Sequence, residues 1–189
     1  KEDLHTAIEG SLKRLQTDYV DLYQLHWPER KTNFFGKLNY KHDPNDEWKD
    51  NFLEIIETLN GLIKEGKIKH YGLSNETAWG AMHFLKEADM NNLPRLVSVQ
   101  NPYSLLNRSY EIGLAEVGMR ENVGLLAYSP LGMGALTGKY LDGKQPADAR
   151  LTLYKAFSRY NSSLVAEAVA KFDQLAKDNG ISVTHLALA

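Results

Sequence analysis

The chain alternates between two hydrophobic patterns. Apolar side chains first recur every three or four residues, which predicts a helix over residues 2–15. The run 19–25 that follows has the length and the aromatic and aliphatic content of a strand. The same succession then repeats along the chain. The predicted helices cover 2–15, 52–65, 76–90, 109–121, 163–179 and 182–189, and the predicted strands cover 19–25, 68–73, 96–100 and 123–128.

Alternating strands and helices indicate an α/β fold in which helices connect parallel strands. The alternation alone does not separate a closed (β/α)8 TIM barrel from an open doubly wound sheet. Polar residues follow the strands, however, at His26, Ser74-Asn75, Gln100 and Tyr128-Ser129. In a barrel such strand ends converge on one rim, where active sites lie, so we favour the barrel.

The chain holds only part of such a barrel, which typically needs about 250 residues. It has 189 residues and roughly four strand–helix units. A helical pattern is already present at residues 2–15, and the helical pattern of 182–189 has no C-terminal stop signal. We therefore expect 1–189 to be one partial barrel domain of a longer parent chain.

The segment Pro28–Asn51 breaks the regular succession. Connections between elements are usually about 4–6 residues long, and much longer ones tend to be functional or disordered. This one carries Phe34, Phe35, Tyr40 and Trp48. The aromatic residues predict an ordered loop that covers part of the molecule. Gly66, after the helical pattern of 52–65, is the expected stop of that helix.

Composition narrows the classes of function. The net charge is −2, and acidic and basic residues are mixed along the chain, which gives no reason to expect a nucleic-acid partner. No apolar run approaches the roughly 20 residues of a membrane helix, so no membrane partner is expected. The chain has no cysteine, which excludes disulfides and thiolate metal sites and fits a cytoplasmic protein.

Three strand ends carry candidate chemistry. His26 follows the strand 19–25, where its imidazole is either a hydrogen-bond donor to a substrate oxygen or a structural loop residue. Ser74 and Asn75 either cap the next helix or bind a polar ligand group. Gln100 ends the third strand, and its amide could pair with an amide of a ligand.

The segment 128–134 (YSPLGMG) places an aromatic ring before a loop of small residues. Backbone N–H groups in such loops can bind phosphate, and Tyr128 offers a flat stacking face. Lys139 could add a positive charge for a phosphate, or it is a solvated surface lysine. The six histidines show no metal-ligand spacing, so no metal site is expected.

Together these segments resemble the aldo-keto reductase family. The resemblance covers nearly the whole chain, and it is closest to the bacterial Tas-like subgroup, which shares the loop segment Asn33–Leu38. The matching runs are DYVDLYQLHWP (18–28), GKIKHYGLSN (66–75), VQNPYSLLNR (99–108), LAYSPLG (126–132) and LTGKY (136–140).

The resemblance implies a (β/α)8 barrel that reduces aldehydes or ketones to alcohols with NADPH, without a metal. By this likeness His26 is the catalytic residue that orients the carbonyl and stabilises its growing negative charge. The likeness also implies a set of cofactor-binding residues. Ser74, Asn75 and Gln100 would hold the nicotinamide carboxamide, Tyr128 would stack on its ring, Ser129, Leu131 and Met133 would bind the pyrophosphate, and Lys139 and Arg150 would contact a phosphate.

The family's proton-donating Tyr, with its Asp and Lys partners, would fall before Lys1. The loops for the adenosine phosphate would fall beyond Ala189. We therefore expect activity for the parent protein and little or none for 1–189 alone, because a partial barrel also leaves open sheet edges. The alternative is an NADPH-binding regulatory subunit like those of potassium channels. A metal-dependent barrel hydrolase is a third reading, and the missing ligand spacing argues against it.

Overall fold

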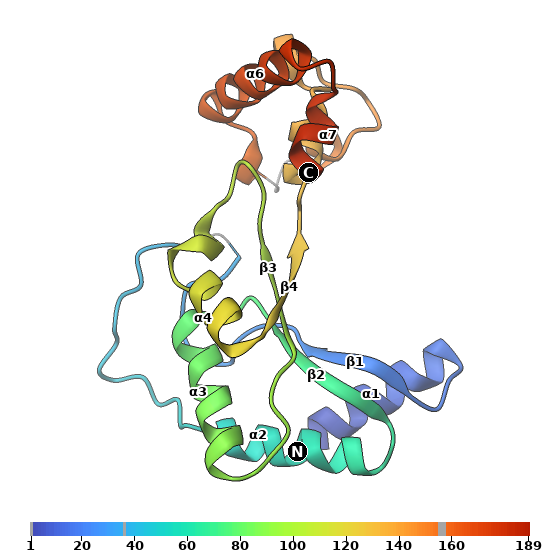
Figure 1. Cartoon of the computed structure of the whole chain (residues 1–189), viewed down its shortest axis with the longest axis vertical. Coiled ribbons are helices and arrows are strands. Elements are labelled where there is room, and N and C mark those ends of the chain that lie inside the picture. Colours follow the sequence, from blue (N-terminus) through green and yellow to red (C-terminus); the bar gives the residue numbers. More distant parts are fainter. Residues whose placement is uncertain (1, 36, 155–157) are drawn as a thin grey trace. The chain divides into compact units, whose positions relative to one another are not determined.

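A computed structural model describes residues 2–35, 37–154 and 158–189 (Figure 1). Lys1 lies outside the described residues, and so does Gly36 of the loop segment Asn33–Leu38. The strands are β1 (Val20–Leu25), β2 (Ile68–Ser74), β3 (Ser98–Pro102) and β4 (Gly124–Tyr128). The α-helices are α1 (Glu2–Leu15), α2 (Phe52–Lys64), α3 (Ala78–Met90), α4 (Leu114–Glu121), α5 (Arg150–Leu153), α6 (Ser163–Asp178) and α7 (Val183–Leu188). Short 3-10 turns are η1 (Ser109–Ile112), η2 (Gly132–Thr137), η3 (Leu141–Gly143) and η4 (Ser158–Tyr160).

The chain forms two compact units. The first unit comprises residues 1–101 and 113–126, and the second comprises 102–112 and 127–189. The strands form one sheet in the order β1-β2-β3-β4. The pairs β1–β2 and β2–β3 are parallel, as the alternation of strands and helices predicts.

The core of the first unit lies between the sheet and its connecting helices. The buried face of α2 comprises Ile56, Leu59 and Leu62, and β2 contributes Tyr71 and Leu73. Helix α2 contacts both β2 and α3 (Figure 1). Helical spacing therefore gives α2 one apolar face, and this face is turned towards β2 and α3.

Gly66 ends α2 as predicted. Its φ of 75° lies in the left-handed region, which glycine adopts without the cost of a side chain. The N–H of Lys67 then donates to the carbonyl of Leu62 at 3.0 Å, which satisfies one of the last carbonyls of the helix. The chain is thereby turned directly into β2.

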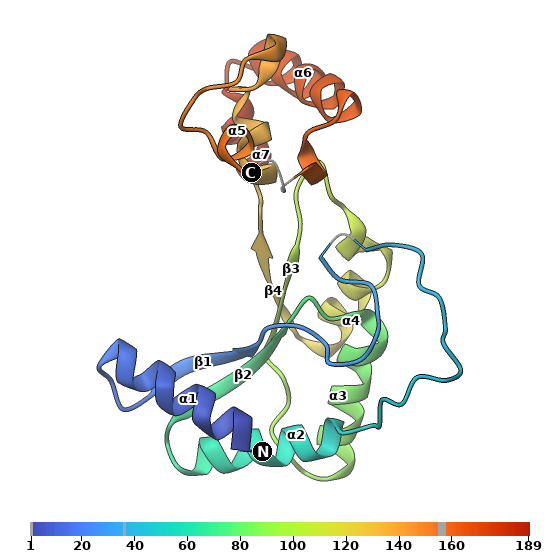
Figure 2. The same cartoon turned by 180° about the vertical axis from the view of Figure 1, so that it is seen from behind.

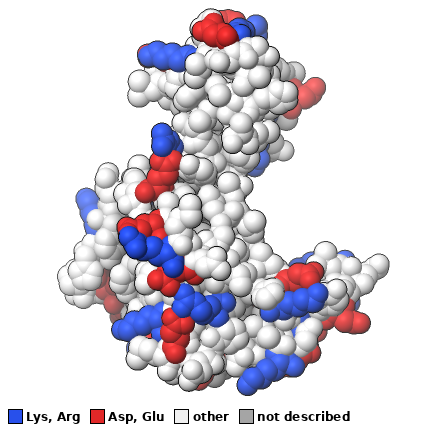
Figure 3. Space-filling view, viewed as in Figure 1, with Lys and Arg blue, Asp and Glu red and all other residues white. Residues whose placement is uncertain are grey.

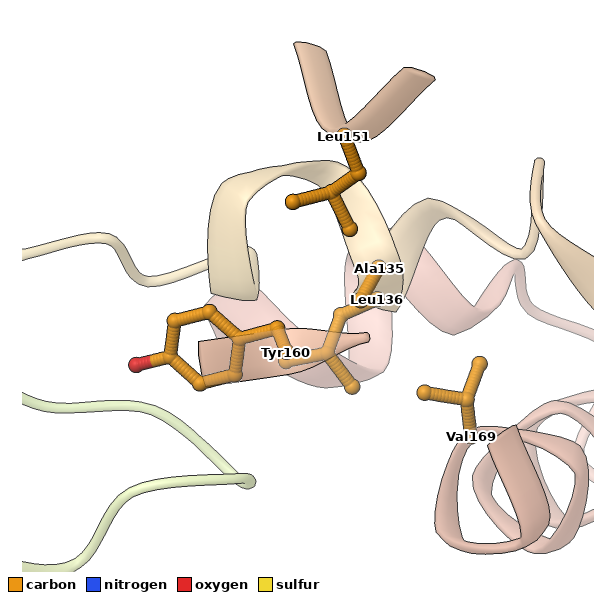
Figure 4. Close-up of a cluster of buried hydrophobic side chains, with 5 residues drawn as sticks. All are labelled: Ala135, Leu136, Leu151, Tyr160 and Val169. Carbon is orange, nitrogen blue, oxygen red and sulfur yellow. The ribbon is translucent and has the colours of Figure 1, made fainter. Parts of the chain in front are cut away.

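The second unit has its own apolar core (Figure 4). Leu136 of η2 is fully buried, and Leu151 of α5, Tyr160 of η4 and Val169 of α6 pack around it with Ala135. The described residues between β4 and α6, 129–154 and 158–162, are therefore more than a plain loop. Their short turns are held by apolar contacts that come from distant parts of the sequence.

Two helix predictions were wrong in detail. Ser74 and Asn75 do not cap the next helix, because Thr77 is the N-cap of α3 and accepts from the N–H of Gly80. The single helix predicted over 109–121 is instead η1 followed by α4. The break is at Gly113, whose φ of −169° and ψ of −36° are not helical.

Charged side chains of both signs lie side by side over the face drawn in Figure 3. Several form exposed ion pairs, such as Lys69 with Asp21 at 2.6 Å and Arg120 with Glu116 at 2.7 Å. Exposed pairs of this kind contribute little to stability, commonly below about 1 kcal/mol.

Candidate functional site

The ends of β1, β2 and β3 meet in one hydrogen-bonded cluster. The Asn75 side-chain nitrogen donates to the carbonyl of His26 at 2.8 Å, and the Ser74 hydroxyl donates to the carbonyl of Gln100 at 2.9 Å. The Asn75 backbone N–H also donates to that Gln100 carbonyl at 3.0 Å. The structure thus brings together the four residues that the sequence singled out in the first unit.

Asn75 owes this position to its backbone. Its φ of 58° is left-handed, a conformation that asparagine tolerates better than most residues. This conformation turns the chain out of β2, while the Asn75 side chain reaches the end of β1. Ser74 and Asn75 are both buried, at 5% and 4% exposure, so their contacts bind the three strand ends together. Whether they also bind a cofactor stays a prediction.

Gln24 is a site residue that sequence reasoning missed. The Gln100 side-chain nitrogen donates to Gln24 Oε1 at 3.0 Å, although β2 separates the two strands. The register pairs Gln24 with Gly72, which has no side chain and leaves room for this contact. The only available signal was the alternation that puts Gln24 on the same side of the strand as the position of His26.

The long loop returns to His26. Phe35, at φ 51°, places its ring 6.0 Å from the imidazole and 5.8 Å from the ring of Trp27, both edge-on. The rings of Trp27 and His26 are 4.3 Å apart. His26 itself is exposed. The structure therefore places the rings of Trp27 and Phe35 beside the exposed imidazole.

Two polar contacts hold the segment Pro28–Asn51 to α3 and to the residues just before it. Near its start, Arg30 forms a buried ion pair with Glu76. Near its end, Asp50 Oδ2 lies 2.8 Å from His83 Nε2. Between these anchors the loop runs past α3 (Figure 2). The loop and Trp79 together line a cavity of about 630 Å³.

A second cavity of about 680 Å³ lies on the helix-facing side of the strands. Leu25 and Leu73 line it together with Phe52 and Ile55 of α2. These two leucines alternate with Gln24 and Ser74, so they belong to the opposite face of the sheet. His26 and Ser74, at the ends of β1 and β2, also line this cavity, so the strand-end cluster borders it.

In the second unit, the small-residue loop has an unusual backbone. The φ angles are 53° at Ser129, 54° at Gly132, 55° at Met133 and 94° at Gly134. Left-handed residues other than glycine are uncommon, and they often occur where a loop has a function. The N–H of Gly134 donates to the carbonyl of Leu131 at 2.9 Å, which holds the loop in a tight turn.

Lys139 lies against this loop. A Cβ on Gly134 would be 3.3 Å from Lys139 Nζ, so the lysine side chain folds over the bare glycine. The arrangement puts a cation beside a glycine turn. Arg150 begins α5 and is exposed. Its neighbour Leu151 donates its N–H to the Tyr140 hydroxyl at 3.1 Å, which ties α5 to the residue after Lys139.

Tyr128 ends β4 and is half-buried. Burial raises the pKa of its hydroxyl, and the neighbouring positive charge of Arg159 opposes that rise. The ring is therefore neutral at physiological pH and suited to stacking. Of the residues proposed from sequence, those of the second unit lie on one continuous stretch from β4 to α5.

The aldo/keto reductase family model matches residues 1–189. The chain belongs to this family. The family fold is the (β/α)8 barrel, and the four strand–helix units seen in this aldo/keto reductase chain are barrel units. The fold prediction is thus confirmed, as is the resemblance drawn from sequence. The family is one of oxidoreductases that generally use NAD(P)H.

Several curated proteins are similar to this aldo/keto reductase chain. Protein tas of Escherichia coli (strain K12) is 50% identical over 194 residues, covering 100% of this chain and 54% of that protein. An aldo-keto reductase of Babesia bovis is 40% identical over 187 residues, with 93% and 66% covered. A probable voltage-gated potassium channel subunit beta of Oryza sativa subsp. japonica is 32% identical over 190 residues, with 97% and 52% covered.

The chain spans about half the length of the first curated relatives it matches. Within the residues that the structure describes, no helix combines the length and the apolar content needed to cross a membrane.

Proposed function

We propose that the protein carrying this chain reduces aldehydes or ketones to alcohols with NADPH, without a metal. The observation that carries the proposal is the cluster of strand ends, where His26, Ser74, Asn75 and Gln100 are joined through short hydrogen bonds. Family membership supplies the reaction class. In this proposal the substrate is a small carbonyl compound, and the protein is located in the cytoplasm.

The residues present fit the nicotinamide cofactor. In the first unit, the Gln24–Gln100 amide pair presents the donor and acceptor types that a carboxamide requires. The second unit offers the loop of Ser129, Leu131 and Met133, with Lys139 folded over Gly134. Ser129 and Met133 have left-handed backbones, and the pattern suits phosphate. Tyr128 supplies a neutral ring for stacking, and Arg150 a further cation. When bound, the cofactor supplies the hydride for the carbonyl carbon.

His26 carries the chemistry that this chain supplies. Its exposed imidazole donates a hydrogen bond to the carbonyl oxygen of the substrate and stabilises the negative charge that grows there. Asn75 holds the His26 carbonyl, and so orients the imidazole through the backbone. The rings of Trp27 and Phe35 lie beside the imidazole and provide apolar surface next to the reacting group.

A titration of the protein at its natural length with NADPH, followed by nicotinamide fluorescence, tests the cofactor. Turnover of 4-nitrobenzaldehyde, followed by NADPH absorbance, tests the reaction. The variant His26→Gln should lower kcat by roughly 100- to 10,000-fold, as loss of a positioned proton-donating group does, while NADPH still binds. Absence of any NADPH signal would refute the proposal. The segment 1–189, prepared alone, should give little or no turnover.

A regulatory subunit is the second candidate. The observation that favours it is the likeness to a protein named as a probable potassium channel subunit beta. A protein of this kind would bind NADPH and show no turnover with any of a panel of aldehydes. Binding together with turnover favours the reductase, and binding alone favours the regulatory subunit.

A further inference from the structure

Arg30 and Glu76 form the most enclosed ion pair of the described residues. Their side chains are 10% and 3% exposed. Arg30 Nη2 donates to Glu76 Oε1 at 2.5 Å and Nη1 donates to Oε2 at 3.1 Å, so the contact is bidentate. Nη2 also donates to the Thr77 hydroxyl at 3.1 Å. Paired geometry of this kind restricts direction as well as distance.

The surroundings are built to accept this pair. The Arg30 guanidinium lies 4.9 Å from the ring centroid of Trp79 and 5.5 Å from that of Phe52. Gly80 leaves space for it, because a Cβ there would be 2.5 Å from Arg30 Nη2. The N–H of Thr77 donates to Glu76 Oε1 at 2.6 Å, which orients the carboxylate from its own side.

The pair joins the two turns that carry the candidate chemistry. Arg30 follows His26 by four residues, and Glu76 directly follows Asn75. The Glu76 carbonyl accepts from the Asn101 side-chain nitrogen at 2.8 Å, so the turn after β2 is also held to the end of β3. Removing two charges from water is costly, and replacing a buried pair by apolar residues is often neutral or stabilising. Stability alone is therefore a weak reason for a buried pair here.

We propose that Arg30 and Glu76 are positioning residues for the reductase reaction. They hold the turn after β1 against the turn after β2, and thereby fix the position of the His26 imidazole relative to Ser74 and Asn75. The inference rests on the proposed function. A misplacement of about 1 Å at a reacting group can cost about 100-fold in rate, so loss of the pair should appear mainly in kcat.

The test compares a double variant with the wild type at natural length. Arg30→Met with Glu76→Leu replaces the pair by apolar side chains and leaves no unpaired buried charge. We expect the unfolding temperature to stay near that of the wild type, kcat for 4-nitrobenzaldehyde to fall about 10- to 100-fold, and the Kd for NADPH to change less than about threefold. If the pair served stability alone, the double variant would have both the stability and the kcat of the wild type. A wild-type kcat in the double variant therefore overturns the inference.

Chemical rescue gives a second readout, which also serves if the double variant does not fold. Arg30→Ala leaves space beside Trp79, and millimolar guanidinium should restore part of its kcat with saturation. Rescue should be absent in Arg30→Ala with Glu76→Leu, where no carboxylate binds the guanidinium. A kcat of Arg30→Ala that equals the wild type also overturns the inference.

The exposed pair Lys69–Asp21 provides the matched control. Lys69→Met with Asp21→Leu makes the same change of charge at a pair that is 52% and 74% exposed, and it should leave kcat unchanged. The two proposals fail in different ways. A wild-type protein without NADPH signal or turnover refutes the proposed function, whereas an active wild type with fully active Arg30 variants refutes only the positioning role.

Discussion

Gly72 offers the sharpest test of how the strand ends are packed. It lies in β2 between Gln24 of β1 and Ser98 of β3. A Cβ built on Gly72 would be 2.8 Å from the Ser98 carbonyl oxygen, and closer still to the Ser98 hydroxyl. The hydroxyl can rotate away, but the carbonyl belongs to the neighbouring strand. Gly72→Ala must therefore push β2 and β3 apart.

The expected cost follows from that overlap. Placing one extra carbon into a packed core typically costs about 1–3 kcal/mol, and the backbone contact puts Gly72→Ala in the upper half of this range. The Gly72–Ser98 pair that would be displaced lies two residues before the Ser74–Gln100 pair. The Kd for NADPH should therefore rise as well, because Gln100 would lose its alignment with Gln24.

Urea unfolding of the natural-length protein measures the free energy, and Gly61→Ala is the matched control. Gly61 is in α2, with nothing within 4 Å of an added Cβ, so alanine there should stabilise the protein by about 0.5–1 kcal/mol. Adding Ser98→Ala to Gly72→Ala removes only the overlap with the hydroxyl and should recover part of the loss. An unchanged free energy of unfolding in Gly72→Ala would show that β2 and β3 have room for the added methyl group.

The remaining predictions concern the amide pair, the phosphate loop and the alkaline limit of stability. Gln24→Leu removes the partner of Gln100 and should raise the Kd for NADPH about 3- to 10-fold, measured by fluorescence titration; an unchanged Kd would remove Gln24 from the site. Lys139→Met should weaken NADPH binding and make its salt dependence shallower, and an equal slope for both proteins would argue against a phosphate contact. Burial raises the pKa of Tyr71 above that of a free phenol, near 10. The unfolded chain therefore loses this proton first, and stability present below about pH 10 should decline above it. Tyr71→Phe should flatten that decline in urea unfolding at pH 8, 10 and 11, and equal slopes would contradict this cause.

The sequence by itself determined the order and type of the main elements. The helical spacing in α2 and the stop at Gly66 are local properties, because each depends on residues a few positions apart. Local pattern also showed that polar residues follow the strands. The parallel sheet then explains why the ends of β1, β2 and β3 are neighbours.

Only the tertiary structure decided which side chains meet. Local chemistry offered Asn75 as a helix cap, yet its left-handed backbone sends the side chain to the carbonyl of His26, 49 residues away. Gln24 and Gln100 are 76 residues apart, and Arg30 and Glu76 are 46 apart. Periodicity assigns a residue to a face of its own strand or helix, but it carries no information on its partner in another element. That pairing depends on strand register and on the space left by Gly72 and Gly80, which exist only in the folded chain.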